Sequence, residues 1–322
     1  MEKTETPKKP RQIHPIVWGL LLFVIAQVLT LLLVQRIDPF LAENNIYVPG
    51  QPDQAISVLP GETTLPSGEV IVVPVYSSLV PILIYFAVVV AILGVIFAII
   101  PVRMLKTVLR AVFALVFGWG VFIMAVFWLP LQIAIGLAIM VSLIWFFIPR
   151  VWFHDAALTL SFVSLGAVFG RFITPWTGMI IIGALAVYDF LAVRSGFMVW
   201  MADKMTQTSA LPALVIPRYA GEWGDSLKEK GIQNIVQTEA ADRKYSIVGG
   251  GDISFPCLLT ASVYFSQAQG LAPGIIMAVA GTAGLGVAYL IQKFIVKGKP
   301  VPALPPIAVC TLIGLLVIRA TG

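Results

Sequence analysis

The chain has 322 residues, of which 59% are hydrophobic and only 11% are charged, and its mean hydropathy is +0.94. A soluble domain carries about 25% charged residues, and a chain this apolar could not cover its surface in water. The composition therefore excludes a soluble globular protein. The net charge of +5 does not indicate a nucleic-acid-binding protein, because the basic residues form no single patch and are divided among several predicted loops.

Nine apolar segments are long enough to cross a bilayer as helices, which takes roughly 20 residues each. The first of them follows a polar, mostly basic segment and is too long for a signal-peptide core of about 7–15 residues. A β-barrel would show alternating runs of about ten residues, and the sequence has none. We therefore expect an all-α polytopic membrane protein. The predicted spans are residues 15–34, 81–100, 108–128, 131–148, 156–172, 176–201, 246–265, 273–295 and 302–318.

The distribution of Lys and Arg predicts how these spans are oriented. With the N-terminus in the cytoplasm, nine spans place every Lys and Arg on the cytoplasmic side except Arg36, Arg171 and Arg319. Cytoplasmic loops of membrane proteins carry an excess of these residues. We therefore expect a cytoplasmic N-terminus and an external C-terminus, since eight or ten spans would spoil the alternation.

The predicted spans fall into two groups. Residues 1–201 form an N-terminal six-helix part, residues 202–245 a cytoplasmic loop, and residues 246–322 a C-terminal three-helix part. A second polar segment, residues 36–70, is rich in Pro, Gly and acids and is expected outside. The two cysteines lie in apolar segments and indicate no disulfide framework.

Two acidic residues lie inside predicted helices, Asp189 in the sixth span and Asp252 in the seventh. The other acids fall in predicted loops or tails, with Asp155 at the edge of the fifth span. An acid at the centre of a bilayer costs about 2.5–3.5 kcal/mol on insertion scales and indicates a functional site by default. Neither span offers a cation at the same depth, and Arg194 lies toward the cytoplasmic face. We therefore expect each aspartate to pair with the other.

Two neighbouring carboxyl groups can share one proton, which is the arrangement in aspartic proteases. One carboxylate takes a proton from water while the protonated partner donates to the peptide carbonyl. Membrane acids also serve proton and ion relays, so the pair by itself fits a proton-coupled transporter or an ion channel as well. A transporter would need a further polar pathway, for which the spans offer few residues, and the sequence lacks the repeat typical of many transporters.

Three short motifs occur in order on the sixth, seventh and ninth predicted spans. They are Tyr188-Asp189, Gly249-Gly250-Gly251-Asp252 and Pro302-Ala303-Leu304. Together they resemble the presenilin and signal peptide peptidase family of intramembrane aspartyl proteases, which carries Tyr-Asp, Gly-x-Gly-Asp and Pro-Ala-Leu on these helices. A second Pro-Ala-Leu at residues 212–214 shows how easily that tripeptide arises by chance. The ordered set is far more specific than any one motif.

The resemblance implies an intramembrane endopeptidase that cleaves within or near transmembrane helices, with Asp189 and Asp252 as its catalytic pair. It implies that the flanking motif residues shape the active site or bind substrate. Each of these residues also has a structural alternative: small-residue packing for the glycines, a helix start for the proline motif and simple packing for the tyrosine. The residues concerned are Tyr188, Gly249, Gly250, Gly251, Pro302, Ala303 and Leu304.

Two features separate this chain from better-known members of the family. Gly250 occupies a position that is often leucine, which predicts a looser segment and leaves substrate preference open. The cytoplasmic N-terminus is similar to that of presenilin, whereas signal peptide peptidases run the opposite way. This orientation predicts a preference for single-span substrates with an external N-terminus.

No cofactor, metal or nucleic acid is expected. The histidines, His14 and His154, both lie at span edges, and no cluster has the spacing of metal ligands. Gly281, Gly284 and Gly286 indicate helix packing, since no phosphate-loop Lys-Ser/Thr follows them. The expected partners are transmembrane substrates and the lipid bilayer, without obligatory partner subunits and with the oligomeric state left open. Compact loops suit a prokaryotic plasma membrane.

Overall fold

The computed structural model describes residues 15–46, 62–64, 70–72, 88, 102–208, 211–228, 232, 244–266, 270–296 and 301–321. Within these ranges, six helices are long and apolar enough to cross a membrane. The fold is therefore mainly helical and suited to a multi-pass membrane protein. The second predicted span, residues 81–100, lies outside the described residues except for Val88. The total of nine spans and their orientation stay predictions.

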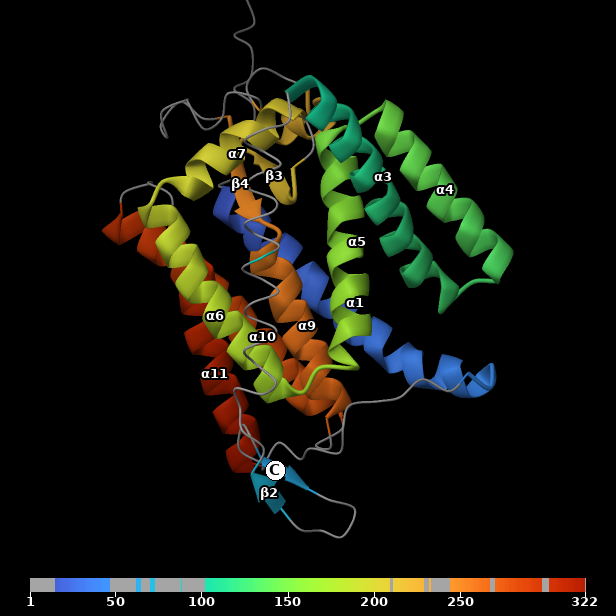
Figure 1. Ribbon diagram of the computed structural model, residues 1–322, viewed down its shortest axis with the longest axis vertical. Helices are drawn as coiled ribbons and strands as arrows, with labels where there is room; N and C mark the ends of the chain where they lie inside the picture. Colours follow the sequence, from blue (N-terminus) through green and yellow to red (C-terminus); the bar gives the residue numbers. More distant parts are fainter. Residues whose placement is uncertain are drawn as a thin grey trace, which may run out of the picture.

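Helices make up most of the described chain, and strands form two small antiparallel pairs (Figure 1). The helices are α1 (Pro15–Glu43), α3 (Val102–Val126), α4 (Leu131–Phe147), α5 (Val151–Gly170), α6 (Pro175–Arg194), α7 (Phe197–Thr208), α9 (Gly251–Phe265), α10 (Leu271–Leu290) and α11 (Leu304–Thr321). A π-helix, Ile291–Ile295, continues α10, and a 3-10 helix spans Ala220–Gly224. Strand β1 (Glu62–Thr64) pairs with β2 (Val70–Val72), and β3 (Ala213–Pro217) pairs with β4 (Tyr245–Gly249).

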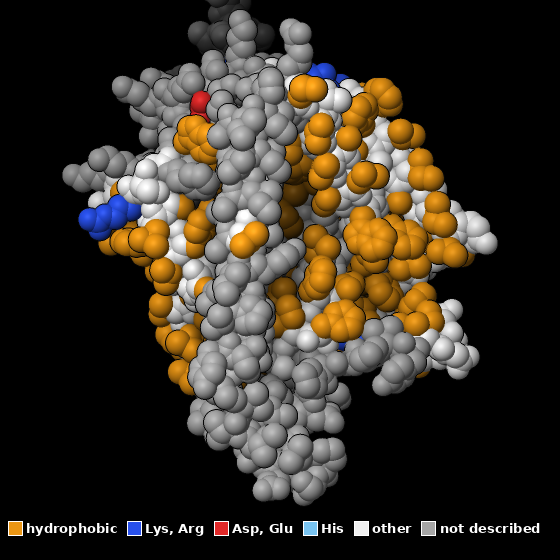
Figure 2. All heavy atoms as spheres, viewed as in Figure 1, with side chains coloured by type: hydrophobic (Ala, Val, Ile, Leu, Met, Phe, Trp, Pro, Cys, Tyr) orange, Lys and Arg blue, Asp and Glu red, His pale blue; other side chains and the backbone are white. Residues whose placement is uncertain are grey.

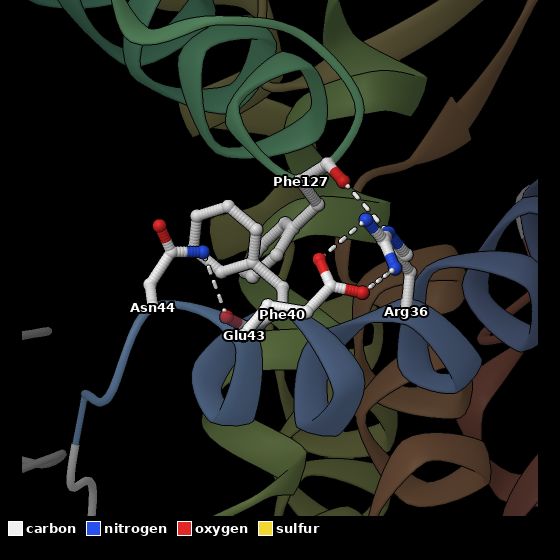
Figure 3. A network of polar contacts seen from close by, with 5 residues as sticks. All are labelled: Arg36, Phe40, Glu43, Asn44 and Phe127. Atoms are coloured by element: carbon white, nitrogen blue, oxygen red, sulfur yellow. Dashed lines mark hydrogen bonds and ion pairs between the residues drawn. The ribbon is translucent and has the colours of Figure 1, made fainter.

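Helix α1 runs to Glu43, well past the predicted end of the first span at residue 34. Its polar end is held by side-chain contacts that hydropathy does not detect (Figure 3). The Arg36 guanidinium forms an ion pair with Glu43, at 2.9 Å, and donates to the Phe127 carbonyl at 3.1 Å. The Phe40 ring packs edge-on against Phe127, with ring centroids 5.0 Å apart. The helix therefore continues because Arg36 finds one partner within α1 and another on the α3–α4 turn.

The predicted sixth span, residues 176–201, is wrong as a single helix. Helix α6 ends at Arg194, and Gly196 adopts a φ of +76°, a left-handed conformation that glycine takes at little cost. The chain then turns, and α7 runs across the end of the bundle to contact α3 (Figure 1). The apolar residues after Gly196 belong to this second helix.

The predicted seventh span, residues 246–265, also combines two elements. Its first residues form β4, and the helix α9 begins only at Gly251. The partner strand β3 lies inside the predicted cytoplasmic loop, is buried along its whole length and includes two residues of the second Pro-Ala-Leu sequence. That tripeptide is therefore a structural element of the fold.

Helix α9 occupies the centre of the bundle and contacts α1, α5, α6 and α10. Helix α4 lies at the edge and packs mainly on α3 (Figure 1). Figure 2 shows hydrophobic side chains across the described surface of α3 and α4, and Leu115 and Phe147 on these helices are 72% and 67% exposed. Such a surface is stable against lipid hydrocarbon, whereas water would disfavour it.

Glycines bring the central helices into close contact. A Cβ atom at Gly170 of α5 would lie 2.5 Å from the Cβ of Ala261 and 2.7 Å from the carbonyl oxygen of Leu258 on α9. Gly166, one turn earlier, faces the same helix, which gives the small-xxx-small spacing typical of membrane helix pairs.

The glycines of α10 largely pack as predicted. A Cβ atom at Gly284 would lie 2.5 Å from the Cα of Ile307, so this glycine seats the start of α11. Gly281 makes ordinary contacts with Pro256 and Phe23. Gly286 has no described atom within 4 Å of its virtual Cβ, so its packing role stays a prediction.

We expect Gly170→Ala to destabilise the protein by about 1–3 kcal/mol, because the added methyl group overpacks the α5–α9 contact. The matched control is Gly136→Ala in α4, where no described atom lies within 4 Å of the added Cβ. That control should be neutral or stabilising by up to about 1 kcal/mol, since alanine favours the helix. Thermal unfolding in detergent compares the two. Equal melting temperatures would contradict the packing role.

Candidate functional site

Asp189 lies in the last two turns of α6, on its buried face. Ile182, Leu185 and Ala186 share this face at helical spacing, and Asp189 itself is only 7% exposed. The stripe packs against α9 and α11, so the otherwise apolar contact carries one carboxyl group into the bundle. The sequence prediction of a buried acid on this helix is confirmed.

The Asp189 carboxyl lies near the backbone N–H groups of Leu304 and Ala303. Helix α11 begins at Leu304, so at least one of these amides is an unpaired donor of a helix N-terminus. Helix N-termini favour negative charge, because their free N–H groups and the helix dipole both point toward it. The Pro302-Ala303-Leu304 motif therefore contacts Asp189 through its backbone.

Asp252 lies in the first turn of α9, immediately after β4. Its carboxyl lies near the Gly249 backbone N–H, at the end of that strand. A Cβ atom at Gly249 would approach Oδ2 of Asp252 to 3.0 Å. The short connection of strand and helix thus fixes where this carboxyl points.

The carboxyl groups of Asp189 and Asp252 are close enough to interact electrostatically. Helix α6 ends and α9 begins at the same end of the bundle, next to β3 and β4 (Figure 1). The helix ends that carry the two acids therefore lie toward the same end of the bundle, and the predicted pairing of the carboxyl groups stays a prediction. Tyr188 lies half-buried beside Asp189 and interacts with it electrostatically, which leaves both of its predicted roles open.

Gly250 is tightly enclosed, so the looser segment predicted from this glycine is wrong. A Cβ atom there would lie 2.3 Å from Cζ of Phe162 and 2.5 Å from the Pro212 carbonyl oxygen. The same carbonyl accepts the Gly250 backbone N–H at 2.9 Å. Gly251 is less crowded, because its virtual Cβ would make ordinary contacts with the Phe255 ring at 3.5 Å.

Sequence analysis missed two buried polar residues of α5, His154 and Asp155. Both were assigned to a span edge, but α5 begins at Val151, so both lie inside the helix and are at most 1% exposed. A third missed group is the Tyr289 hydroxyl of α10, which is buried beside Gly19 with no hydrogen bond among the described residues. For His154 and Asp155, a predicted helix start at Val151 instead of residue 156 would have placed both residues inside the helix.

No group of three or more His, Cys, Asp or Glu residues within the described ranges could hold a metal ion.

Comparisons with known proteins agree with this geometry. The sequence profile described as signal-peptide peptidase, presenilin aspartyl protease matches residues 20–321. The chain belongs to this family. It is accordingly an intramembrane aspartyl protease, which is a hydrolase, and nothing in the comparisons supports the transporter or channel alternative.

Two solved structures of a presenilin family intramembrane aspartate protease, in the C222 and P2 space groups, resemble this family member. Their TM-scores are 0.58 and 0.53, with 17% and 18% sequence identity. The alignments cover 96% and 97% of this chain and all of the other chains. At this identity the likeness establishes the fold. A search among curated proteins found no match.

We expect Gly250→Ala to lower the melting temperature, because the rigid Pro212 carbonyl leaves no room for a methyl group. Gly251→Ala is the matched control, since its methyl group would meet only the Phe255 ring at van der Waals distance. Thermal unfolding of both variants in detergent measures the difference. Equal stability of the two would show that the Gly250 position is less crowded than the geometry indicates.

Proposed function

We propose that Asp189 and Asp252 are the catalytic pair of this protease and hydrolyse peptide bonds of transmembrane substrates. The observation that carries the proposal is that these two carboxyl groups are close enough to interact electrostatically, with the amides of Ala303 and Leu304 beside Asp189. The water-activating mechanism follows from this arrangement. One carboxylate takes a proton from water, and the other carboxyl group donates its proton to the scissile carbonyl oxygen.

The amides of Ala303 and Leu304 orient the Asp189 carboxyl group. They hold the Asp189 carboxyl in one position while its charge changes during the reaction, so that little reorganisation is needed. The Gly249 amide does the same for Asp252. After attack, the tetrahedral intermediate collapses, the C–N bond breaks, and the leaving amine takes a proton from the pair.

A substrate helix must unwind before its peptide bonds can be cut, and the edge of β4 offers it a template. The Gly250 N–H bonds to the Pro212 carbonyl and the Arg218 N–H to the Lys244 carbonyl, so hydrogen-bonded pairs alternate along the ladder. By this alternation the backbone groups of Ile247 point away from β3. An extended substrate segment added here would run directly beside Asp252.

We also infer nine spans with a cytoplasmic N-terminus, arranged as a six-helix part (1–201), a cytoplasmic loop (202–245) and a three-helix part (246–322). The enzyme would act without obligatory partner subunits, in a prokaryotic plasma membrane. Tyr188, Gly249, Gly250, Gly251 and the Pro302-Ala303-Leu304 motif would shape the substrate site around the pair.

Replacement of either aspartate by asparagine should abolish cleavage. Asparagine keeps the size of the side chain but cannot exchange the proton, so we expect a loss of at least about 10²–10⁴-fold for Asp189→Asn and for Asp252→Asn. The assay is cleavage of a purified single-span substrate in detergent, read by mass spectrometry. The control is Asp203→Asn on α7, an acid outside the proposed pair. Cleavage by both Asp189→Asn and Asp252→Asn at the parent rate would refute the proposal.

Substrate orientation provides a separate test. With a cytoplasmic N-terminus, the enzyme should cut single-span substrates whose N-terminus is external and leave inverted ones largely intact. Both orientations of the same segment, flanked by identical tags and co-expressed with the enzyme in membranes, allow the comparison by immunoblot. Cleavage of the inverted substrate alone would contradict the orientation hypothesis but not the assignment of the catalytic pair.

A further inference from the structure

His154 and Asp155 are neighbours on α5 and both bind strand β3. The Nε2 atom of His154 lies 3.2 Å from the Ala213 carbonyl oxygen, and Oδ1 of Asp155 accepts the Val215 backbone N–H at 3.0 Å. The two side chains are 0% and 1% exposed. Neither belongs to the proposed catalytic pair, and burial of such polar groups is costly unless they bond.

The histidine ring is fixed from both sides. Trp145 donates its indole N–H to Nδ1 of His154, at 3.2 Å. Because an indole nitrogen can only donate, Nδ1 must be the acceptor, and Nε2 therefore carries the proton that is donated to Ala213. The ring is neutral and holds a single orientation, which makes it a rigid support for the strand.

These bonds occupy the edge of β3 that faces away from β4. Ala213 and Val215 alternate with the residues that pair across the ladder, so their backbone groups point toward α5. Helix α5 therefore satisfies the outer edge of β3 through two side chains. A strand edge closed in this way cannot receive another strand, whereas no strand among the described residues pairs with the other edge of β4.

Short contacts link β3 to Asp252, so a shift of the strand would also move this residue. The Pro212 carbonyl, directly before β3, accepts the Gly250 N–H, and Gly249 at the end of β4 packs against the Asp252 carboxyl. Phe162, two turns along α5 from Asp155, encloses Gly250 from the other side. One helix thus fixes both the strand pair and the start of α9.

Burying a carboxyl group costs desolvation free energy that an apolar side chain would not cost. Oδ2 of Asp155 is buried without a hydrogen bond among the described residues, so half of the group has no protein partner to offset its burial there. A leucine of similar size would pack at lower cost in an apolar helix contact. The bond from Oδ1 to Val215 is the feature that a leucine could not supply.

We propose that His154 and Asp155 are positioning residues that hold β3 against α5, and thereby set the register at which an extended substrate meets Asp252 along the open edge of β4. This inference rests on the proposed proteolytic function. If this clamp, meaning the contacts of His154 and Asp155 with β3, is released, β3 and β4 can shift. The substrate is then cut at different bonds and more slowly.

The test compares Asp155→Leu, which loses the acceptor, with Asp155→Asn, which keeps the Oδ1 acceptor and the shape. The full chain in detergent cleaves a single-span substrate, and mass spectrometry maps every cut bond while kcat and KM are measured separately. For Asp155→Leu we expect displaced cleavage sites and a kcat lower by on the order of 10–100-fold, because small misplacements of reacting groups have effects of this size. Asp155→Asn should cut at the parent sites within about threefold of the parent kcat.

A second variant removes the same hydrogen bond from the strand. Val215→Pro deletes the N–H that Asp155 accepts, but breaks no bond between β3 and β4, because that N–H points to α5. If the two changes act through one bond, the double variant Asp155→Leu, Val215→Pro should behave like either single variant. Folded variants that cut the parent bonds at the parent rate would overturn the inference.

Hydrogen exchange keeps the test decisive if a variant is unstable or the parent is inactive. The amides of residues 213–216 and 245–249 should lose protection in Asp155→Leu and keep it in Asp155→Asn. Unchanged protection would overturn the clamp even where cleavage is lost. A parent that cuts no substrate contradicts the proposed function, and the exchange comparison then decides the clamp on its own.

Discussion

The central constraint on the structure is the placement of two acidic residues in a bundle whose other contacts are mostly apolar. Asp189 comes from the end of α6 and Asp252 from the start of α9, so the chain must bring the ends of two helices to one depth. Backbone amides lie beside both acids: those of Ala303 and Leu304 beside Asp189, and that of Gly249 beside Asp252. Backbone donors cannot change rotamer, so they can orient the acids without a charged side chain among the described residues.

The helices around these amides are packed by glycines. Gly284 seats the start of α11, which carries the amides for Asp189, and Gly166 and Gly170 seat α9, which carries Asp252. Close backbone contact of this kind is a main source of helix association in lipid, where the hydrophobic effect between helices is absent. The accuracy of the site therefore depends on residues that never contact a substrate.

Much of the architecture could be predicted from hydropathy, because a bilayer demands long apolar helices and penalises each buried acid. Asp189 and Asp252 stood out for that reason, and the motif order identified the family. The misses have a common cause. The turn at Gly196, the strands β3 and β4 and the clamp of His154 and Asp155 on β3 all depend on tertiary contacts, and hydropathy treats strand residues such as those of β4 as the beginning of a helix.

The enclosure of Gly250 has a consequence for how this enzyme can evolve. A side chain at this position needs space that the Phe162 ring and the Pro212 carbonyl now fill. Exchange of Gly250 for leucine would therefore require a smaller residue at position 162 and a displaced strand, and each change alone would be harmful. We expect positions 162 and 250 to vary together among close homologues, with small residues at one site accompanying large ones at the other.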